Sequence, residues 1–360
     1  MKNKILKVIV VILIMILIIG SFVYFINKNT KEGTSKMSGY ELKSNINVVA
    51  SLEDEITEDT AWCGTFNLIW NDLKNDLAKQ DIVFTPQLKM VENLNKETFN
   101  TSYLSEESYY KTYGIPSIQL KEKIEKEIKE KFNETSDILD SFDWENACPE
   151  DYFLYSMLKK EFEFPKQFTD LPNGKFGNYE NVKYFGINSS TDENVREQVE
   201  VLYYNSKDDF AIKLKTKTDD EVIISKGNTQ NTFKEIYEEI QKNNQNYKDN
   251  KALTKNDTLQ IPNIDFNVKK EYEELENNTF KFSNGEEYKI DKALQTIQFS
   301  LDKKGGKIRS EAGMMVNKSS LLQDNPREFL VNDTFCIFLK EKNKELPYFA
   351  SKISDITKVQ

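Results

Sequence analysis

The sequence predicts an α+β fold, in which several sheets and a cluster of helices form one domain behind a single N-terminal transmembrane helix. Three observations predict it. Short runs with period-2 alternation indicate strands, as at Ile297, Phe299 and Leu301. Longer runs with an apolar residue at every third or fourth position indicate helices. An almost wholly apolar run from Ile5 to Ile26 has the length of a helix that crosses a bilayer.

The apolar run near the N-terminus predicts a signal anchor. Lys2, Lys4 and Lys7 lie at its N-terminal end, and positive residues of this kind stay on the cytoplasmic side. A cleaved signal peptide is the alternative, but the run is longer than a usual signal core and no Ala-x-Ala site follows. We therefore expect a single-pass protein of the cell membrane, with a flexible polar stalk over residues 27–44 and one extracellular domain over residues 45–360.

Composition excludes several function classes. The 360-residue chain has 49 basic and 59 acidic residues, and its net charge of −10 argues against nucleic acid as a partner. It has no histidine, so a Ser-His-Asp triad, a Cys-His pair and a histidine-ligated zinc are impossible. A hydrolase would have to rely on carboxylates, a Ser-Lys pair or a carboxylate-held metal, and only the abundance of Asp and Glu favours such an enzyme. We expect no catalytic residue, no metal site, no cofactor and no enzymatic activity. The abundance of Lys, Asn, Ile and Glu suggests a bacterial source with an AT-rich genome.

The three cysteines do not define a disulfide framework. Cys336 lies within an apolar run and is expected to be a small core residue. Cys63 and Cys148 are able to form a disulfide outside a cell, and the sequence leaves their pairing open.

Two amphipathic helices are predicted in the first half of the chain. The first covers Ala61–Lys79, with Asp59 or Thr60 as its N-cap. Its apolar residues share one face, namely Trp62, Phe66, Trp70, Leu73 and Leu77. The second covers residues 116–132, and its inner face carries Leu120, Ile124, Ile128 and Phe132.

The rest of the chain alternates between strand and helix signals. Strands are predicted over residues 151–158, 199–204, 210–214 and 221–225, and a helix over residues 232–241. Near the C-terminus, Phe335–Leu339 is an unbroken apolar run typical of a strand buried on both faces. A charged turn returns the chain into Tyr348–Ala350, which predicts a hairpin within a core.

A long loop, over about residues 306–328, separates the strand that ends at Leu301 from this hairpin. It contains paired glycines, two methionines and many polar residues. A long segment tied at both ends to buried strands is uncommon unless it has a function.

The order of these elements resembles the serpins over residues 151–360. Serpins end a strand with Asp-x-x-Gly, continue with a small-residue hinge and an exposed bait loop, and finish with a Phe-x-Phe type strand and a hairpin. The corresponding segments here begin at Asp302 and Gly305, continue at Ser310-Glu311-Ala312-Gly313 and finish at Phe335–Phe338 and Tyr348-Phe349. Earlier matches are Lys159, Phe162 and Pro165, with Phe162 in place of the family's tryptophan. The N-terminal half shares no motif.

The resemblance implies a serpin-like multi-sheet domain that inhibits a serine or cysteine protease. The protease would cleave the bait loop near Leu321, Leu322 and Gln323, and the freed loop would insert into a central sheet as a new strand. A non-inhibitory binding or structural module of the same fold at the cell surface is the alternative.

Two ways of counting along the loop disagree. Counting back from Phe335 places the hinge at Ser310–Gly313, with Ser310 and Ala312 pointing inward. Counting forward from Gly305 places it about four residues earlier. The loop therefore carries an insertion at Gly306–Arg309 relative to the family, and this insertion includes two basic residues.

Overall fold

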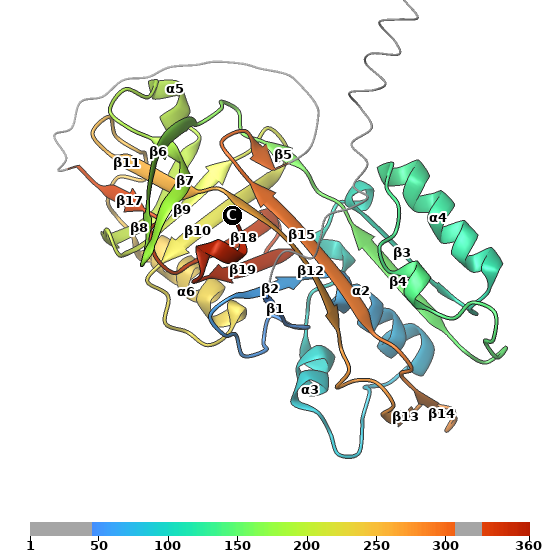
Figure 1. Cartoon of the computed structure of the whole chain (residues 1–360). Coiled ribbons are helices and arrows are strands. Elements are labelled where there is room, and N and C mark those ends of the chain that lie inside the picture. Colours follow the sequence, from blue (N-terminus) through green and yellow to red (C-terminus); the bar gives the residue numbers. More distant parts are fainter. Residues whose placement is uncertain (1–44, 307–325) are drawn as a thin grey trace, which may run out of the picture. The chain divides into compact units, whose positions relative to one another are not determined.

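A computed structural model describes residues 45–306 and 326–360 (Figure 1). These residues belong to one compact unit, Leu42–Gln360. The predicted transmembrane helix and stalk, the hinge Ser310–Gly313 and the bait residues Leu321–Gln323 lie outside the described residues. Within the described part, no helix has both the length and the apolar character needed to cross a membrane.

The largest element of the fold is a seven-stranded sheet. Its strands, in spatial order, are β1 (Asn47–Val48), β2 (Thr60–Cys63), β19 (Phe349–Ile353), β18 (Phe335–Glu341), β10 (Asp220–Lys226), β9 (Asp209–Lys215) and β8 (Val199–Ser206). The predicted C-terminal hairpin is confirmed as β18–β19, with Ile337 opposite Ser351. The helix α6 (Phe233–Asn246), capped by Thr232, packs on β18.

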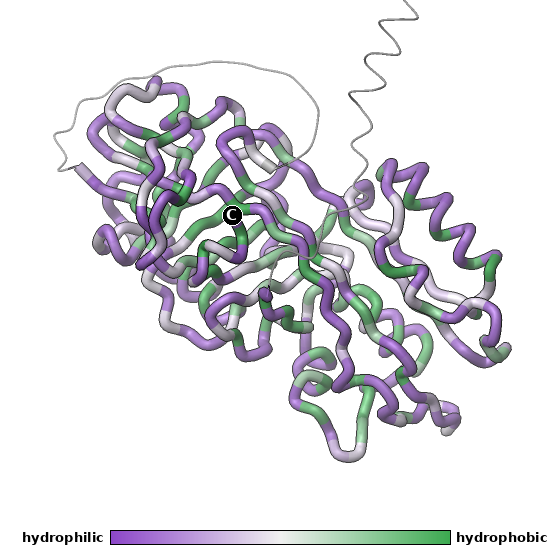
Figure 2. Tube along the Cα trace, in the orientation of Figure 1, coloured by the Kyte–Doolittle hydropathy of each residue, from purple (hydrophilic) through white to green (hydrophobic). Residues whose placement is uncertain are grey.

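A four-stranded sheet shares a core with this larger sheet. Its order is β17 (Glu328–Leu330), β11 (Thr258–Pro262), β7 (Tyr179–Ile187) and β6 (Thr169–Phe176). Side chains of the two sheets belong to one hydrophobic core, as the ring contact between Phe210 and Phe329 illustrates. Figure 2 shows the hydrophobic residues concentrated along these central strands.

The remaining strands form four separate pairs. They are β12 (Ile264–Glu271) with β15 (Leu294–Leu301), β3 (Tyr109–Gly114) with β4 (Phe153–Leu158), β5 (Phe162–Glu163) with β16 (Gly305–Gly306), and β13 (Thr279–Lys281) with β14 (Glu287–Lys289). We refer to β12–β15 and β3–β4 as the two ribbons. The predicted alternation in β15 is confirmed, because Ile297, Phe299 and Leu301 are buried while Gln298 and Ser300 are exposed.

The helices confirm the predictions over residues 116–132 and 232–241 and correct the third. Helix α4 (Ile118–Phe132) is capped by Ser117, and Ile124, Ile128 and Phe132 are buried against the β3–β4 ribbon as expected. The other helices are α2 (Thr65–Asn71), its π-helical continuation η1 (Asp72–Ala78), α3 (Lys89–Lys96) and α5 (Glu193–Arg196). Single 3₁₀ turns are η2 (Thr101–Tyr103), η3 (Glu106–Ser108), η4 (Leu139–Ser141) and η5 (Ile356–Lys358).

The predicted helix Ala61–Lys79 is wrong in its first turn. Ala61–Cys63 belongs to strand β2, which pairs with β19 and β1. Trp62 therefore packs in the main core and Trp70 in a second core below α2, rather than on one stripe. Asp59 does not cap this helix, because its carboxylate accepts hydrogen bonds from the backbone of Ser354 and Asp355. Pairing with a buried neighbouring strand outweighed the helical periodicity.

The cysteines are all free thiols in the structure. Cys63 and Cys336 are buried, and Cys148 is exposed. Cys336 is 1% exposed, which confirms that it is a core residue. Burial in an apolar strand raises the pKa of the Cys336 thiol to about 12, so the thiol stays protonated.

Candidate functional site

The candidate site begins at the tight turn that ends β15. Asp302 and Gly305 exchange two backbone hydrogen bonds of 3.2 Å, and the chain reverses into β16. Gly305 has φ +130°, and a Cβ there would lie 2.2 Å from the backbone oxygen of Phe162. Only glycine fits this position, which explains the Asp-x-x-Gly spacing physically. The turn therefore brings the start of the loop against β5.

The β16 segment lies between the ends of the two ribbons. It is antiparallel to β5, with Gly305 opposite Glu163 and Gly306 opposite Phe162. It is also antiparallel to β15, from which it turns back, so β5 and β15 run parallel to each other. Strand β5 follows β4 after a corner of three residues, 159–161. The β16 segment therefore lies near the end of β4, and a strand extended from it would run back along β15, antiparallel to it.

Beyond this junction the two ribbons are not joined by a backbone ladder. Among residues 45–306 and 326–360, β15 pairs along its length only with β12, and β4 only with β3. The expected single central sheet is thus divided, in the described residues, into two ribbons with one short junction. We call the edges of β4 and β15 that lack a ladder partner the open edges. Unpaired strand edges are templates for adding a strand.

One residue of helix α2 connects the open edges by side-chain hydrogen bonds. Ser156 Oγ in β4 donates to the Thr65 carbonyl over 2.7 Å. Gln295 Nε2 in β15 donates to Thr65 Oγ1 over 2.8 Å and to the Cys63 carbonyl over 3.0 Å. The N-terminal end of α2 therefore holds both strands, which do not pair with each other.

An aromatic contact connects the other end of the β3–β4 ribbon to the β13–β14 hairpin. Tyr152 immediately precedes β4, and its ring lies 6.1 Å from the ring of Phe282 and 6.0 Å from that of Tyr288. These two rings belong to the hairpin region around β13–β14. Tyr152 is still 42% exposed, so this contact buries little surface.

The C-terminal end of the loop has a different attachment. Arg327 donates from Nη2 to Asp257 Oδ2 over 2.8 Å, and its backbone N–H donates to Asp257 Oδ1 over 2.7 Å. The same guanidinium donates to the carbonyls of Asn250 and Ala252. Strand β17 follows and pairs with β11 over only three residue pairs. A buried charge pair thus fixes a short strand.

The electrostatics of this attachment favour the charged form of Asp257. Burial alone would raise the pKa of this carboxyl group, but the hydrogen bonds from Arg327 and from the Thr254 backbone outweigh it and leave the pKa below its usual value. The carboxylate is fully buried and paired, so losing either partner would leave an uncompensated charge.

Of the residues predicted from the sequence, Asp302 and Gly305 belong to the described part of this site. The hinge Ser310–Gly313 and bait residues Leu321–Gln323 remain predictions, because they lie within 307–325. Sequence reasoning identified Asp302 and Gly305 but missed Thr65, Ser156 and Gln295. The one available signal was Gln295, a polar residue at the start of a half-buried strand. Hydroxyl groups such as those of Thr65 and Ser156 carry no sequence signal for a bond between distant strands.

Comparisons with known proteins agree with the resemblance seen in the sequence. No family model and no curated protein matches the chain. Solved structures do match it, among them the following three. Native Tengpin, a thermophilic serpin, is 13% identical, with 84% of this chain and 90% of that chain covered and a TM-score of 0.48. Thyroxine-binding globulin in complex with thyroxine is 11% identical, with 83% and 93% covered and a TM-score of 0.44. Serpin48 of the insect Tenebrio molitor is 12% identical, with 71% and 78% covered and a TM-score of 0.38.

These matched structures are serpins, the family that residues 151–360 resemble. With identities of 11–13% and TM-scores below 0.5, they carry no conclusion about the activity or the target of this chain. The function is therefore inferred from the strand pairings of the chain itself.

Proposed function

We propose that this protein is a membrane-anchored, extracellular serpin-like inhibitor of a serine or cysteine protease. The protease cleaves the loop between β16 and β17, and the freed N-terminal part of the loop adds to the open edges of β4 and β15. The observation that carries this proposal is β16. It already begins an antiparallel strand at the junction of the two ribbons, and the loop continues from it.

The physical basis of the proposal is strand addition. A new strand between β4 and β15 would find ladder partners on both sides, because neither open edge has one among the described residues. Each backbone hydrogen bond contributes about 1 kcal/mol net, so a strand of several residues adds several kcal/mol. Cleavage is required for this release, since the Arg327–Asp257 pair and β17 hold the other end of the loop.

The alternative function is a non-inhibitory binding module with the same fold. The charges of Lys307, Arg309 and Lys318 favour it, because a charged side chain is costly to bury during insertion. Both alternatives keep the anchor predicted at Ile5–Ile26, which is part of the proposal.

The test is to cleave the loop in the full chain, held in detergent micelles, and to measure the unfolding temperature before and after cleavage. Insertion predicts a large rise. Incubation with a panel of serine and cysteine proteases should also give an SDS-stable adduct and a released C-terminal fragment that begins near Gln323. Cleavage without an adduct and without a rise would favour the binding module.

A matched pair of variants controls for non-specific effects of cleavage. Ala312 is predicted to point inward after insertion, whereas Glu311 is predicted to point to solvent. Ala312→Arg should therefore abolish the rise in unfolding temperature, and Glu311→Arg should preserve it. Equal behaviour of the two variants would contradict the register counted back from Phe335.

A further inference from the structure

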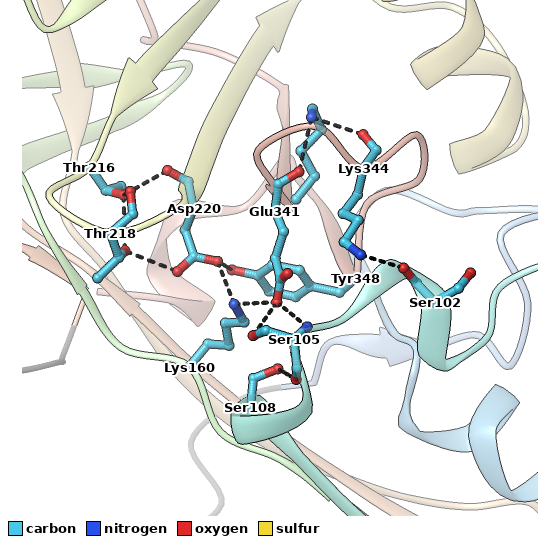
Figure 3. A network of polar contacts seen from close by, with 11 residues as sticks. Ser102, Ser105, Ser108, Lys160, Thr216, Thr218, Asp220, Glu341, Lys344 and Tyr348 are labelled. Atoms are coloured by element: carbon cyan, nitrogen blue, oxygen red, sulfur yellow. Dashed lines mark hydrogen bonds and ion pairs between the residues drawn. The ribbon is translucent and has the colours of Figure 1, made fainter.

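The corner between β4 and β5, residues 159–161, is held to the seven-stranded sheet by a buried cluster of charges (Figure 3). Lys160 Nζ lies 3.0 Å from Asp220 Oδ1 and 2.5 Å from Glu341 Oε1. The three side chains are 10%, 3% and 6% exposed. We call these three residues the charge cluster. One lysine therefore neutralises two buried carboxylates that have little access to water.

The two carboxylates lie side by side on the seven-stranded sheet. Asp220 is the first residue of β10 and Glu341 the last of β18, and they are direct ladder partners. Like charges opposite each other on neighbouring strands repel, and the Lys160 amine between them offsets this repulsion. Tyr348 Oη donates to Asp220 over 3.0 Å, which fixes the orientation of that carboxylate.

The same cluster also holds the beginning of β3. The backbone N–H and the hydroxyl of Ser105 each donate to Glu341 Oε1 over 2.8 Å. Ser105 leads through η3 into β3, whose first residue, Tyr109, is the ladder partner of Leu158, the last residue of β4. Both strands of the β3–β4 ribbon are therefore held at the same end.

The opposite end of this ribbon is held weakly. There Gly114 pairs with Phe153, and the half-exposed ring of Tyr152 contacts the β13–β14 hairpin. Near this end, Lys269 Nζ of β12 donates to Ser141 Oγ of η4 over 3.1 Å. Between the two ends, Ser156 makes a single hydrogen bond to Thr65, and Lys111 pairs with Asp72 of η1. The ribbon thus has one strongly held end and one end that is freer to move.

Insertion of a strand places unequal demands on the two ends of this ribbon. An added strand would lie about 4.8 Å from each neighbour, so β4 and β15 must lie about 9.6 Å apart wherever it inserts. At the corner the place of this strand is already filled, because β16 lies between β5 and β15 there. Farther along the ribbon, no strand of the described residues yet holds this spacing.

We infer that Lys160 is a positioning residue for loop insertion: through Asp220 and Glu341 it makes the corner a fixed pivot, about which the β3–β4 ribbon swings away from β15. This inference rests on the proposed function and adds a specific role for residues of the sheet behind the loop. Without this pivot the corner can shift, so the inserting loop starts in the wrong place. Insertion then slows relative to hydrolysis of the bond between the protease and the cleaved loop.

The test compares Lys160→Met with Lys213→Met in the full chain. Lys213 is a matched control, because its amine also bridges two carboxylates, Glu200 at 3.0 Å and Glu221 at 3.2 Å, but within the seven-stranded sheet and away from the ribbons. The measured quantity is the ratio of SDS-stable adduct to cleaved product. We expect Lys160→Met to lower this ratio roughly tenfold, the effect of losing one strong charge-assisted contact, and Lys213→Met to leave it unchanged.

A second variant covers the case in which Lys160→Met does not fold. The double variant Asp220→Asn, Glu341→Gln removes both buried carboxylate charges, and with them the ion pairs that hold Lys160 to the sheet. It should also lower the ratio of SDS-stable adduct to cleaved product. An unchanged ratio in the folded variants, or an equal loss in Lys213→Met, overturns the inference.

Amide hydrogen exchange separates a failure of the pivot from a failure of the proposed function. In the uncleaved protein, exchange should be slower near Tyr109 and Leu158 than near Gly114 and Phe153, and Lys160→Met should remove this gradient. A gradient that Lys160→Met leaves intact contradicts the pivot. Wild type that shows the gradient but forms no adduct contradicts only the inhibitory function, and leaves the corner as a fixed point of the ribbon.

Discussion

The seven-stranded sheet and the two ribbons are built from similar strands but differ in how their edges are satisfied. Strand β18 has a ladder on both sides, with β10 and β19, and its first five residues are fully buried. Strands β4 and β15 each have one ladder among the described residues, and Thr65 of α2 connects them through its backbone carbonyl and its hydroxyl. The first region is a closed core. The second has two open strand edges that can pair with one more strand, as the proposed function requires.

The largest expected effect is a loss of stability in the closed core. Phe338 is fully buried, and its ring lies 6.0 Å from Phe233 and 5.4 Å from Tyr237 of α6. Phe338→Ala should lower the free energy of unfolding by about 3–5 kcal/mol, because it leaves a cavity. Leu154→Ala in β4, where the side chain is only partly buried, should cost about 1 kcal/mol. Urea unfolding of both variants measures the contrast, and equal losses would contradict it.

The next effect concerns the attachment of the loop beyond the open edges. Asp257→Asn should lower the free energy of unfolding by about 3 kcal/mol at neutral pH, since it removes the partner of a mostly buried Arg327. The folded-state pKa of Asp257 is depressed below its usual value. Its contribution is therefore complete above the unfolded pKa, near 3.9, and is lost as pH falls through the lower, folded pKa.

Unfolding measured across this acidic range checks the sign of the effect. The stability difference between wild type and Asp257→Asn should shrink as pH falls below about 4. A difference that grows on acidification would show that the Asp257 carboxyl group is not stabilised as an anion.

The smallest effect should be confined to the ribbons. Thr65→Val removes the hydroxyl that accepts from Gln295 and should cost about 1 kcal/mol. It should also speed amide exchange in β15. Thr60→Val is the control, because Thr60 lies in β2 of the seven-stranded sheet and its Oγ1 hydrogen-bonds with the backbone and the hydroxyl of Thr57, outside both ribbons. Faster exchange of β15 in both variants would argue against a specific link through Thr65.

Local patterns predicted the elements that have a clear period or cap. The alternation of β15, the apolar run of β18 and the stripe of α4 all correspond to observed elements, with small shifts at their ends. The helix predicted from Ala61 was wrong only in its first turn, because the apolar or small residues Ala61–Cys63 fit a helix face and a buried strand equally well. Partners far away in the sequence, β1 and β19, decided between them.

The sequence by itself determined the elements with a clear period, such as β15, β18 and α4, and the turn at Asp302–Gly305, since only glycine tolerates the φ of Gly305. It also determined the exclusion of histidine chemistry. Only the tertiary structure decided that β4 and β15 remain unpaired with each other, that Thr65 links them, and that Lys160 anchors one end of the β3–β4 ribbon. These features depend on contacts between residues tens to hundreds of positions apart, and no local period encodes such contacts.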